Sequence, residues 1–167
     1  MNEKNVFIDP NVARKKKLGD VLETNKIDVN EPPLFSWIEF NLIGLCNRRC
    51  TFCPWSDPEW RSNHVPKVAG NNDILHLPVE VYTGVMKDLN KVGFKGGIIY
   101  SAFSEPFLYN HLEEVIKISK EQCPDSRIEV VTNGDFLTLE KLNTFFEAGL
   151  TRIDVSVYDG PEKVKPF

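Results

Sequence analysis

Four short apolar segments, separated by amphipathic segments, dominate the chain after residue 33. The apolar segments have the length and composition of strands, and the segments between them repeat apolar residues near helical spacing. Strands and helices that alternate in this way favour an α/β fold with a parallel sheet and right-handed crossovers. We expect strands at 34–42, 97–101, 127–132 and 152–158, and helices at 78–92, 110–118 and 138–148.

The helix boundaries carry recognisable signals. Pro78 suits the first turn of a helix and Gly149 suits a helix end, while Asn110 and Thr138 are residue types that cap helix N-termini. The expected inward face of the helix 78–92 consists of four apolar residues at near-helical spacing: Val81, Val85, Leu89 and Val92.

Unusual residues follow every expected strand. Ligands of parallel α/β folds bind at the carboxyl ends of the strands, so these residues form one candidate site. They are three cysteines after the first strand, Ser104-Glu105-Pro106 after the second, Thr132-Asn133-Gly134 after the third, and Ser156 near the end of the fourth.

Composition and charge limit the function classes. The 167 residues have a formal net charge of −4, which argues against general nucleic-acid binding. No apolar run approaches the roughly 20 residues that span a bilayer, and the lysines at 15–17 precede no signal-peptide core. We expect a cytoplasmic protein without a membrane partner.

Three of the four cysteines crowd into residues 46–53 with the spacing C-x3-C-x2-C. Disulfides among them would close very small loops, so metal or cluster ligation is the better interpretation in a reducing compartment. Three thiolates can hold three corners of a cubane 4Fe–4S cluster and leave the fourth iron open for a chelating ligand. The alternative is a structural zinc site completed by His64 or His76. Cys123 is interpreted as an isolated thiol. Arg48 and Arg49 are interpreted as solvated charges, and the alternative is that they tune the cluster or receive a reductant.

The motif NLIGLCNRRCTFCP, residues 41–54, resembles the radical S-adenosylmethionine (radical SAM) enzymes, and the resemblance extends over about 35–160. It looks most like the branch that carries C-terminal SPASM-type cluster domains and acts on peptides or other small substrates. The resemblance implies that Cys46, Cys50 and Cys53 bind the cluster. S-Adenosylmethionine would chelate the open iron, and Phe52 would lie beside its adenine.

The resemblance also assigns the later motifs. Ser104-Glu105-Pro106 is similar to a Gly-Glu-Pro turn whose backbone and acidic residue receive the cofactor's amino group, although Ser104 replaces the usual glycine. A carboxylate suits an ammonium partner. No catalytic side chain is assigned.

Two further assignments leave a plainer alternative open. Thr132 and Asn133 would lie beside the ribose or the substrate, or they form only a turn, since Asn-Gly is a common turn dipeptide. Ser156 would hydrogen-bond a ribose hydroxyl, or it is an ordinary strand residue.

The expected organisation is an irregular N-terminal extension at 1–32 and, at 33–167, the N-terminal portion of a partial (βα) barrel that is truncated after its fourth strand. The resemblance implies reductive cleavage of S-adenosylmethionine to a 5′-deoxyadenosyl radical, which abstracts hydrogen from an unknown substrate. Expected partners are an electron donor such as a flavodoxin or ferredoxin, and a missing C-terminal half. The alternative is a non-catalytic iron–sulfur module or a degenerate relative without turnover.

Overall fold

A computed structural model of the chain describes residues 36–56, 76–158 and 160. One sheet contains all the strands of this part, in the spatial order β1-β2-β3-β4, and each neighbouring pair is parallel. The strands are β1 (Trp37–Phe40), β2 (Gly97–Tyr100), β3 (Arg127–Thr132) and β4 (Arg152–Val155). The predicted α/β class is therefore confirmed, and the sheet is open rather than closed into a barrel.

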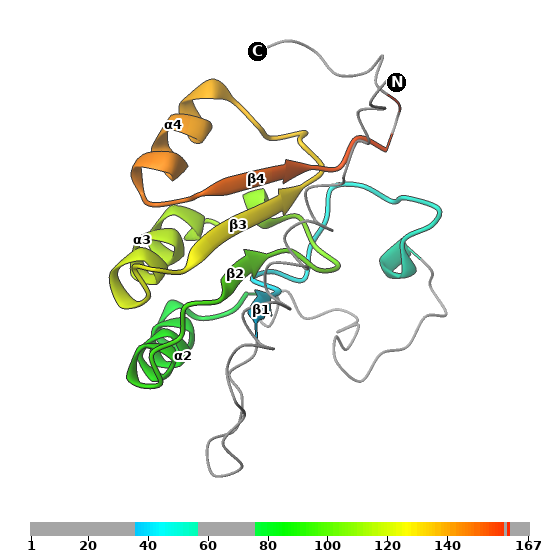
Figure 1. The fold of residues 1–167 in the computed structure, drawn as a ribbon. Helices are drawn as coiled ribbons and strands as arrows, with labels where there is room; N and C mark the ends of the chain where they lie inside the picture. The colour runs from blue at the N-terminus through cyan, green and yellow to red at the C-terminus, as the bar shows by residue number, and fades with distance from the viewer. Residues whose placement is uncertain (1–35, 57–75, 159, 161–167) are drawn as a thin grey trace, which may run out of the picture. The chain divides into compact units, whose positions relative to one another are not determined.

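The unit that carries this sheet comprises Trp37–Phe167. The boundary predicted between residues 32 and 33 lies outside the described residues. The crossovers between the strands contain α2 (Val79–Lys91), α3 (Leu112–Gln122) and α4 (Leu139–Glu147), and the three helices lie along the same side of the sheet (Figure 1). None of the helices in the described ranges is long and apolar enough to cross a membrane.

The helix caps agree with the sequence at one N-terminus and differ at another. The Thr138 hydroxyl accepts a hydrogen bond from the Lys141 amide at 3.2 Å, as predicted. The prediction for Asn110 was wrong, because the N-cap of α3 is His111 and makes no side-chain cap bond. The preceding turn already satisfies the first helical amide, since Leu112 donates to the Tyr109 carbonyl at 3.1 Å.

The buried face of α2 agrees with the predicted one in part, since Leu89 is buried and Val85 packs against the core. Tyr82 and Met86 are fully buried, whereas Val81 is 53% exposed and Val92 is 55% exposed. Burial of Tyr82 also satisfies its hydroxyl, which contacts both Tyr100 and Ser119. The apolar periodicity was therefore wrong for Val81 and Val92 and missed Tyr82, because it gave no weight to a tyrosine that finds polar partners in the core.

These three hydroxyls form a closed network inside the core. The Tyr100 hydroxyl lies 2.7 Å from those of Tyr82 and Ser119, and it donates to the Val115 carbonyl at 3.1 Å. Buried polar groups are tolerated when they are paired in this way. Because Tyr82 is on α2, Tyr100 on β2 and Ser119 on α3, the network fixes two helices against the strand between them.

The end of α4 yields a first prediction. Gly149 has φ +113°, and a Cβ there would lie 2.7 Å from the Cβ and Cγ atoms of Lys120. We expect Gly149→Ala to lower the free energy of unfolding by about 1–2 kcal/mol, because positive φ and the close approach both penalise a side chain. Urea denaturation monitored by circular dichroism measures the change.

Gly84 provides the matched control within α2. A Cβ at this position meets no atom within 4 Å. Gly84→Ala should therefore raise the free energy of unfolding by about 0.5–1 kcal/mol. A change of the same sign in both variants would contradict the structural difference between the two glycines.

A second prediction concerns alkaline pH. Burial raises the pKa of Tyr82 from its usual value of 10.0 to about 12. The unfolded chain ionises this tyrosine first, so its contribution to stability is complete below pH 10 and declines as the pH rises toward 12. The free energy of unfolding should fall by about 1.4 kcal/mol per pH unit from this residue in that window. Tyr82→Phe should remove that part of the slope in urea titrations at pH 10 to 12, and an unchanged slope would contradict it.

Candidate functional site

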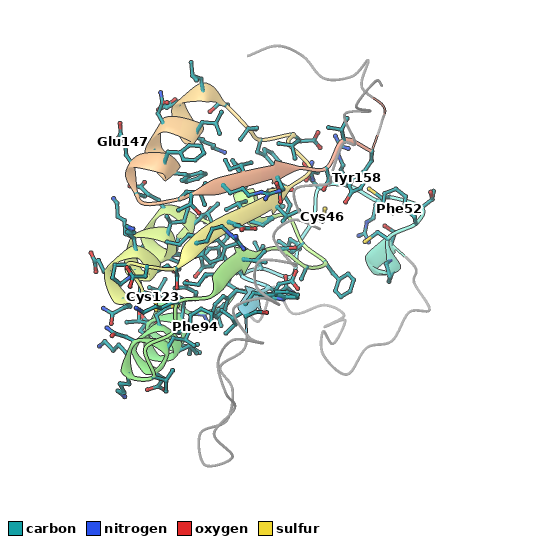
Figure 2. The ribbon with its side chains drawn as sticks, viewed as in Figure 1. Cys46, Phe52, Phe94, Cys123, Glu147 and Tyr158 are labelled. Carbon is teal, nitrogen blue, oxygen red and sulfur yellow. The ribbon has the colours of Figure 1, made fainter. Side chains whose placement is uncertain are left out.

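The three cysteines of the loop after β1 line one cavity of about 270 Å³ at the carboxyl ends of the strands. Cys46, Cys50 and Cys53 are free thiols of intermediate exposure. The loop is compact, since the Cys53 amide donates to the Cys50 carbonyl at 3.0 Å. Cys46 lies on the same side of the unit as Phe52 and Tyr158, whereas Cys123 lies at the other ends of the strands (Figure 2).

Within the described ranges, no three His, Cys, Asp or Glu side chains form a group that could hold a single metal ion. His76 is exposed and does not line the cavity, and His64 lies outside those ranges. In a cubane cluster, by contrast, each thiolate binds a different iron.

The turn after β2 is anchored to the segment that leads into the cysteine loop. The Ser104 hydroxyl donates to Asn41 Oδ1 at 2.6 Å, and the Glu105 amide donates to the Leu45 carbonyl at 2.9 Å. Ser104 and Glu105 line the cavity, whereas Pro106 does not and instead begins a short 3₁₀ turn, Pro106–Leu108. Ala102, in the same turn, has φ 81°, a conformation that is unusual for a residue with a Cβ.

Glu105 is 1% exposed, and its carboxylate accepts hydrogen bonds from protein groups. Oε1 accepts from the Phe107 amide at 3.1 Å and from Thr132 Oγ1 at 2.7 Å, and Oε2 accepts from the Asn133 amide at 2.9 Å. Such donors replace the water that a buried carboxylate loses. The side chain therefore joins the turn after β2 to the turn after β3.

Residues 132–135, which follow β3, form a tight turn and also line the cavity through Thr132 and Asn133. Gly134 has φ +82° and donates its amide to Thr132 Oγ1 at 3.1 Å. The Asp135 amide donates to Asn133 Oδ1 at 2.9 Å, which closes an Asx-type turn. Thr132 and Asn133 therefore form a turn and also line the cavity of the candidate site.

Arg48, in the cysteine loop, forms a two-point ion pair with Asp135. Its Nε lies 2.7 Å from Asp135 Oδ2, and its terminal nitrogen lies 2.5 Å from Oδ1. The prediction that Arg48 is a solvated charge was therefore wrong, since only 23% of its side chain is exposed. The hydrogen bond from this guanidinium is the main cause that lowers the pKa of Asp135 below its usual range.

Two exposed aromatic rings meet at the cavity. Phe52 is 64% exposed and Tyr158 is 52% exposed, and their ring centroids lie 4.8 Å apart at an interplanar angle of 59°. Both rings line the cavity with Ser156, whose amide donates to the Thr132 carbonyl at 2.8 Å. Ser156 thus continues the β3–β4 pairing and also faces the candidate site.

Except for Pro106 and Gly134, all the residues that the sequence predicted for the site line this one cavity. Sequence reasoning missed Asn47, Asp135 and Tyr158. Asp135 directly follows the Thr-Asn-Gly motif, and Tyr158 follows Ser156 by two residues. The positions of Asp135 and Tyr158 near strand ends could have identified them as candidates. Their contacts with the cysteine loop could not be predicted from the sequence.

Comparison with known proteins gives consistent results. The family model of the Radical SAM superfamily matches residues 40–167. The chain is 31% identical over 127 residues to the S-adenosyl-L-methionine-dependent 2-deoxy-scyllo-inosamine dehydrogenase of Niallia circulans, covering 76% of this chain and 46% of that protein. It is 38% identical over 131 residues to the GTP 3′,8-cyclase of Aquifex aeolicus (strain VF5), covering 75% and 36%.

Among solved structures, the chain is similar to BtrN in complex with AdoMet and 2-DOIA, with a TM-score of 0.65 and 30% identity. The similarity covers 78% of this chain and 48% of that one. The chain therefore spans about half or less of the length of these relatives. It belongs to the radical SAM superfamily, whose members are enzymes that bind a 4Fe–4S cluster and S-adenosylmethionine.

Proposed function

We propose that Cys46, Cys50 and Cys53 hold a 4Fe–4S cluster and that S-adenosylmethionine binds beside it in the same cavity. The observation that carries the proposal is that these three thiols and the turn at Ser104 and Glu105 line one cavity at the carboxyl ends of parallel strands. Thiolates are the ligands that such clusters prefer. The similarity to BtrN, a protein solved with AdoMet, supports the same cofactor here.

The turn after β2 would receive the amino group of the cofactor. A carboxylate offers about four lone-pair positions. Protein donors occupy three of those of Glu105, which leaves one acceptor position for a further donor. Glu105 can thus attract an ammonium group while it holds the turns after β2 and β3 together.

The adenine would contact Phe52, and the exposed ring of Tyr158 beside it supplies a second apolar surface. Thr132, Asn133 and Ser156 would face the ribose or the substrate, because they line the same cavity. These residues orient the cofactor and exclude water from part of its surface.

When bound together, the cluster and S-adenosylmethionine would supply one-electron reductive cleavage of the cofactor to methionine and a 5′-deoxyadenosyl radical, for abstraction of hydrogen from the substrate. An external reductant, for example a flavodoxin or ferredoxin, would provide the electron. The two named relatives act on a small cyclitol derivative and on a nucleotide, which supports a small polar substrate rather than a peptide.

For the complete protein we propose membership of the branch with C-terminal SPASM-type cluster domains. This placement rests on the resemblance of the cysteine motif. Iron in clear excess of one cubane cluster per complete protein, measured by metal analysis, would support it. Iron equal to one cluster would contradict it.

Cysteine substitutions test the cluster ligands. The anaerobically reconstituted protein should contain about four iron atoms per motif and should convert S-adenosylmethionine to 5′-deoxyadenosine with dithionite. Cys50→Ala should lose both properties, because it removes one thiolate ligand. Cys123→Ala, which removes a buried thiol at the C-cap of α3, should retain them.

The same assay separates the alternatives. A cluster whose electron paramagnetic resonance (EPR) signal ignores added S-adenosylmethionine would favour the non-catalytic iron–sulfur module. Zinc without iron would contradict the proposed function entirely.

The aromatic pair gives a further prediction. Tyr158→Ala should weaken S-adenosylmethionine binding to the reconstituted protein about tenfold, since aromatic contacts contribute roughly 0.5–1.5 kcal/mol beyond burial. Tyr158→Phe retains the ring and should bind as the unaltered protein does. Titration of the EPR signal with the cofactor measures both, and equal affinity of all three proteins would contradict the assigned contact.

A further inference from the structure

We propose that Asp135 is a positioning residue that fixes the cluster-binding loop, through Asn47 and Arg48, against the turn after β3. This inference rests on the proposed function, because it concerns the loop that carries the three cysteines. Asp135 comes 87 residues after Arg48 in the sequence, yet its carboxylate contacts two consecutive residues between the first and second cysteine.

Both carboxylate oxygens of Asp135 take part. Oδ2 accepts from Asn47 Nδ2 at 2.6 Å and from Arg48 Nε at 2.7 Å, while Oδ1 accepts from the terminal nitrogen of Arg48 at 2.5 Å. A guanidinium that binds a carboxylate at two points is fixed in direction as well as distance. The contact therefore defines the orientation of the loop, not only its proximity.

The hydrogen bonds continue from Asp135 to the first cysteine. The Asp135 amide donates to Asn133 Oδ1, and Asn133 Nδ2 donates to Asn47 Oδ1 at 2.9 Å. The same Asn133 nitrogen lies 3.9 Å from Cys46 Sγ, and the Arg48 amide donates to that sulfur at 3.4 Å. Residues 47, 48, 133 and 135 thus form a ring of contacts around one side of Cys46.

This ring of contacts fixes the position of the cysteine loop and adds little to the stability of the fold. The Arg48 and Asp135 side chains are 23% and 34% exposed, and ion pairs of such exposure add little to the free energy of folding. Cluster binding, unlike folding, requires that the three thiolates are held in one geometry. Partners that orient ligands in this way typically contribute 10- to 100-fold in metal affinity.

Asp135→Ala tests the proposal, with Asp88→Ala as the matched control. Asp88 forms an exposed ion pair with Lys91 on α2 and does not line the cavity. In the anaerobically reconstituted protein, Asp135→Ala should lose iron to a chelator about tenfold faster than the unaltered protein. Asp88→Ala should lose it at the unaltered rate.

Two further measurements separate positioning from a general structural defect. Hydrogen exchange of the amides at 46–50, measured before reconstitution, should accelerate in Asp135→Ala while exchange in β2 and β3 stays unchanged. The midpoint potential of the cluster, from an EPR-monitored redox titration, should fall, because hydrogen bonds to the cluster sulfurs influence it and the Asn133 contact would loosen.

The outcomes are distinct. If the unaltered protein assembles no 4Fe–4S cluster, the proposed function fails. If it assembles the cluster but Asp135→Ala matches Asp88→Ala in iron loss, exchange and potential, the positioning role is overturned. Should Asp135→Ala fail to fold, Asp135→Asn takes its place. That variant keeps the shape and one oxygen acceptor, and should change the three quantities in the same direction by a smaller amount.

Discussion

The buried carboxylate of Glu105 is the contact on which the candidate site depends. It accepts hydrogen bonds from Thr132 and Asn133 in the turn after β3, while its own amide donates to the Leu45 carbonyl before the cysteine loop. A carboxylate that is 1% exposed would cost several kcal/mol without such donors. Its burial is therefore satisfied only when the turns after β2 and β3 are correctly aligned, and the Glu105 amide connects them to the segment after β1.

The ion pair between Arg48 and Asp135 serves a different purpose from the Glu105 contacts. Asp135 is partly exposed, so water can replace its partners at small cost, and the pair adds little to the stability of the fold. What it restricts is the direction of the cysteine loop. The site thus combines a buried interaction, which aligns the strand ends, with an exposed one, which orients the ligand-bearing loop.

The sequence predicted the elements better than their contacts. The strand Arg127–Thr132 has the predicted bounds, and eight of the ten residues that one rule about parallel strands assigned to the site line the cavity. Apolar spacing placed Leu89 and Val85 on the inward face of α2, but it could not predict the burial of Tyr82, which depends on a polar network across three elements. The role of Asp135 could not be predicted for a similar reason, because it depends on a contact with Arg48, which is 87 residues away in the sequence.

The exposure of Phe52 and Tyr158 contrasts with the burial of Glu105 and Thr132 in the same cavity. Exposed rings gain free energy when a ligand covers them, at roughly 25 cal/mol per Å² of apolar surface. Buried polar groups have already exchanged water for protein partners, so they gain less from a ligand but hold their positions before it arrives. Affinity for a flat group such as adenine would therefore come mainly from the two rings, and its orientation from the buried turns after β2 and β3.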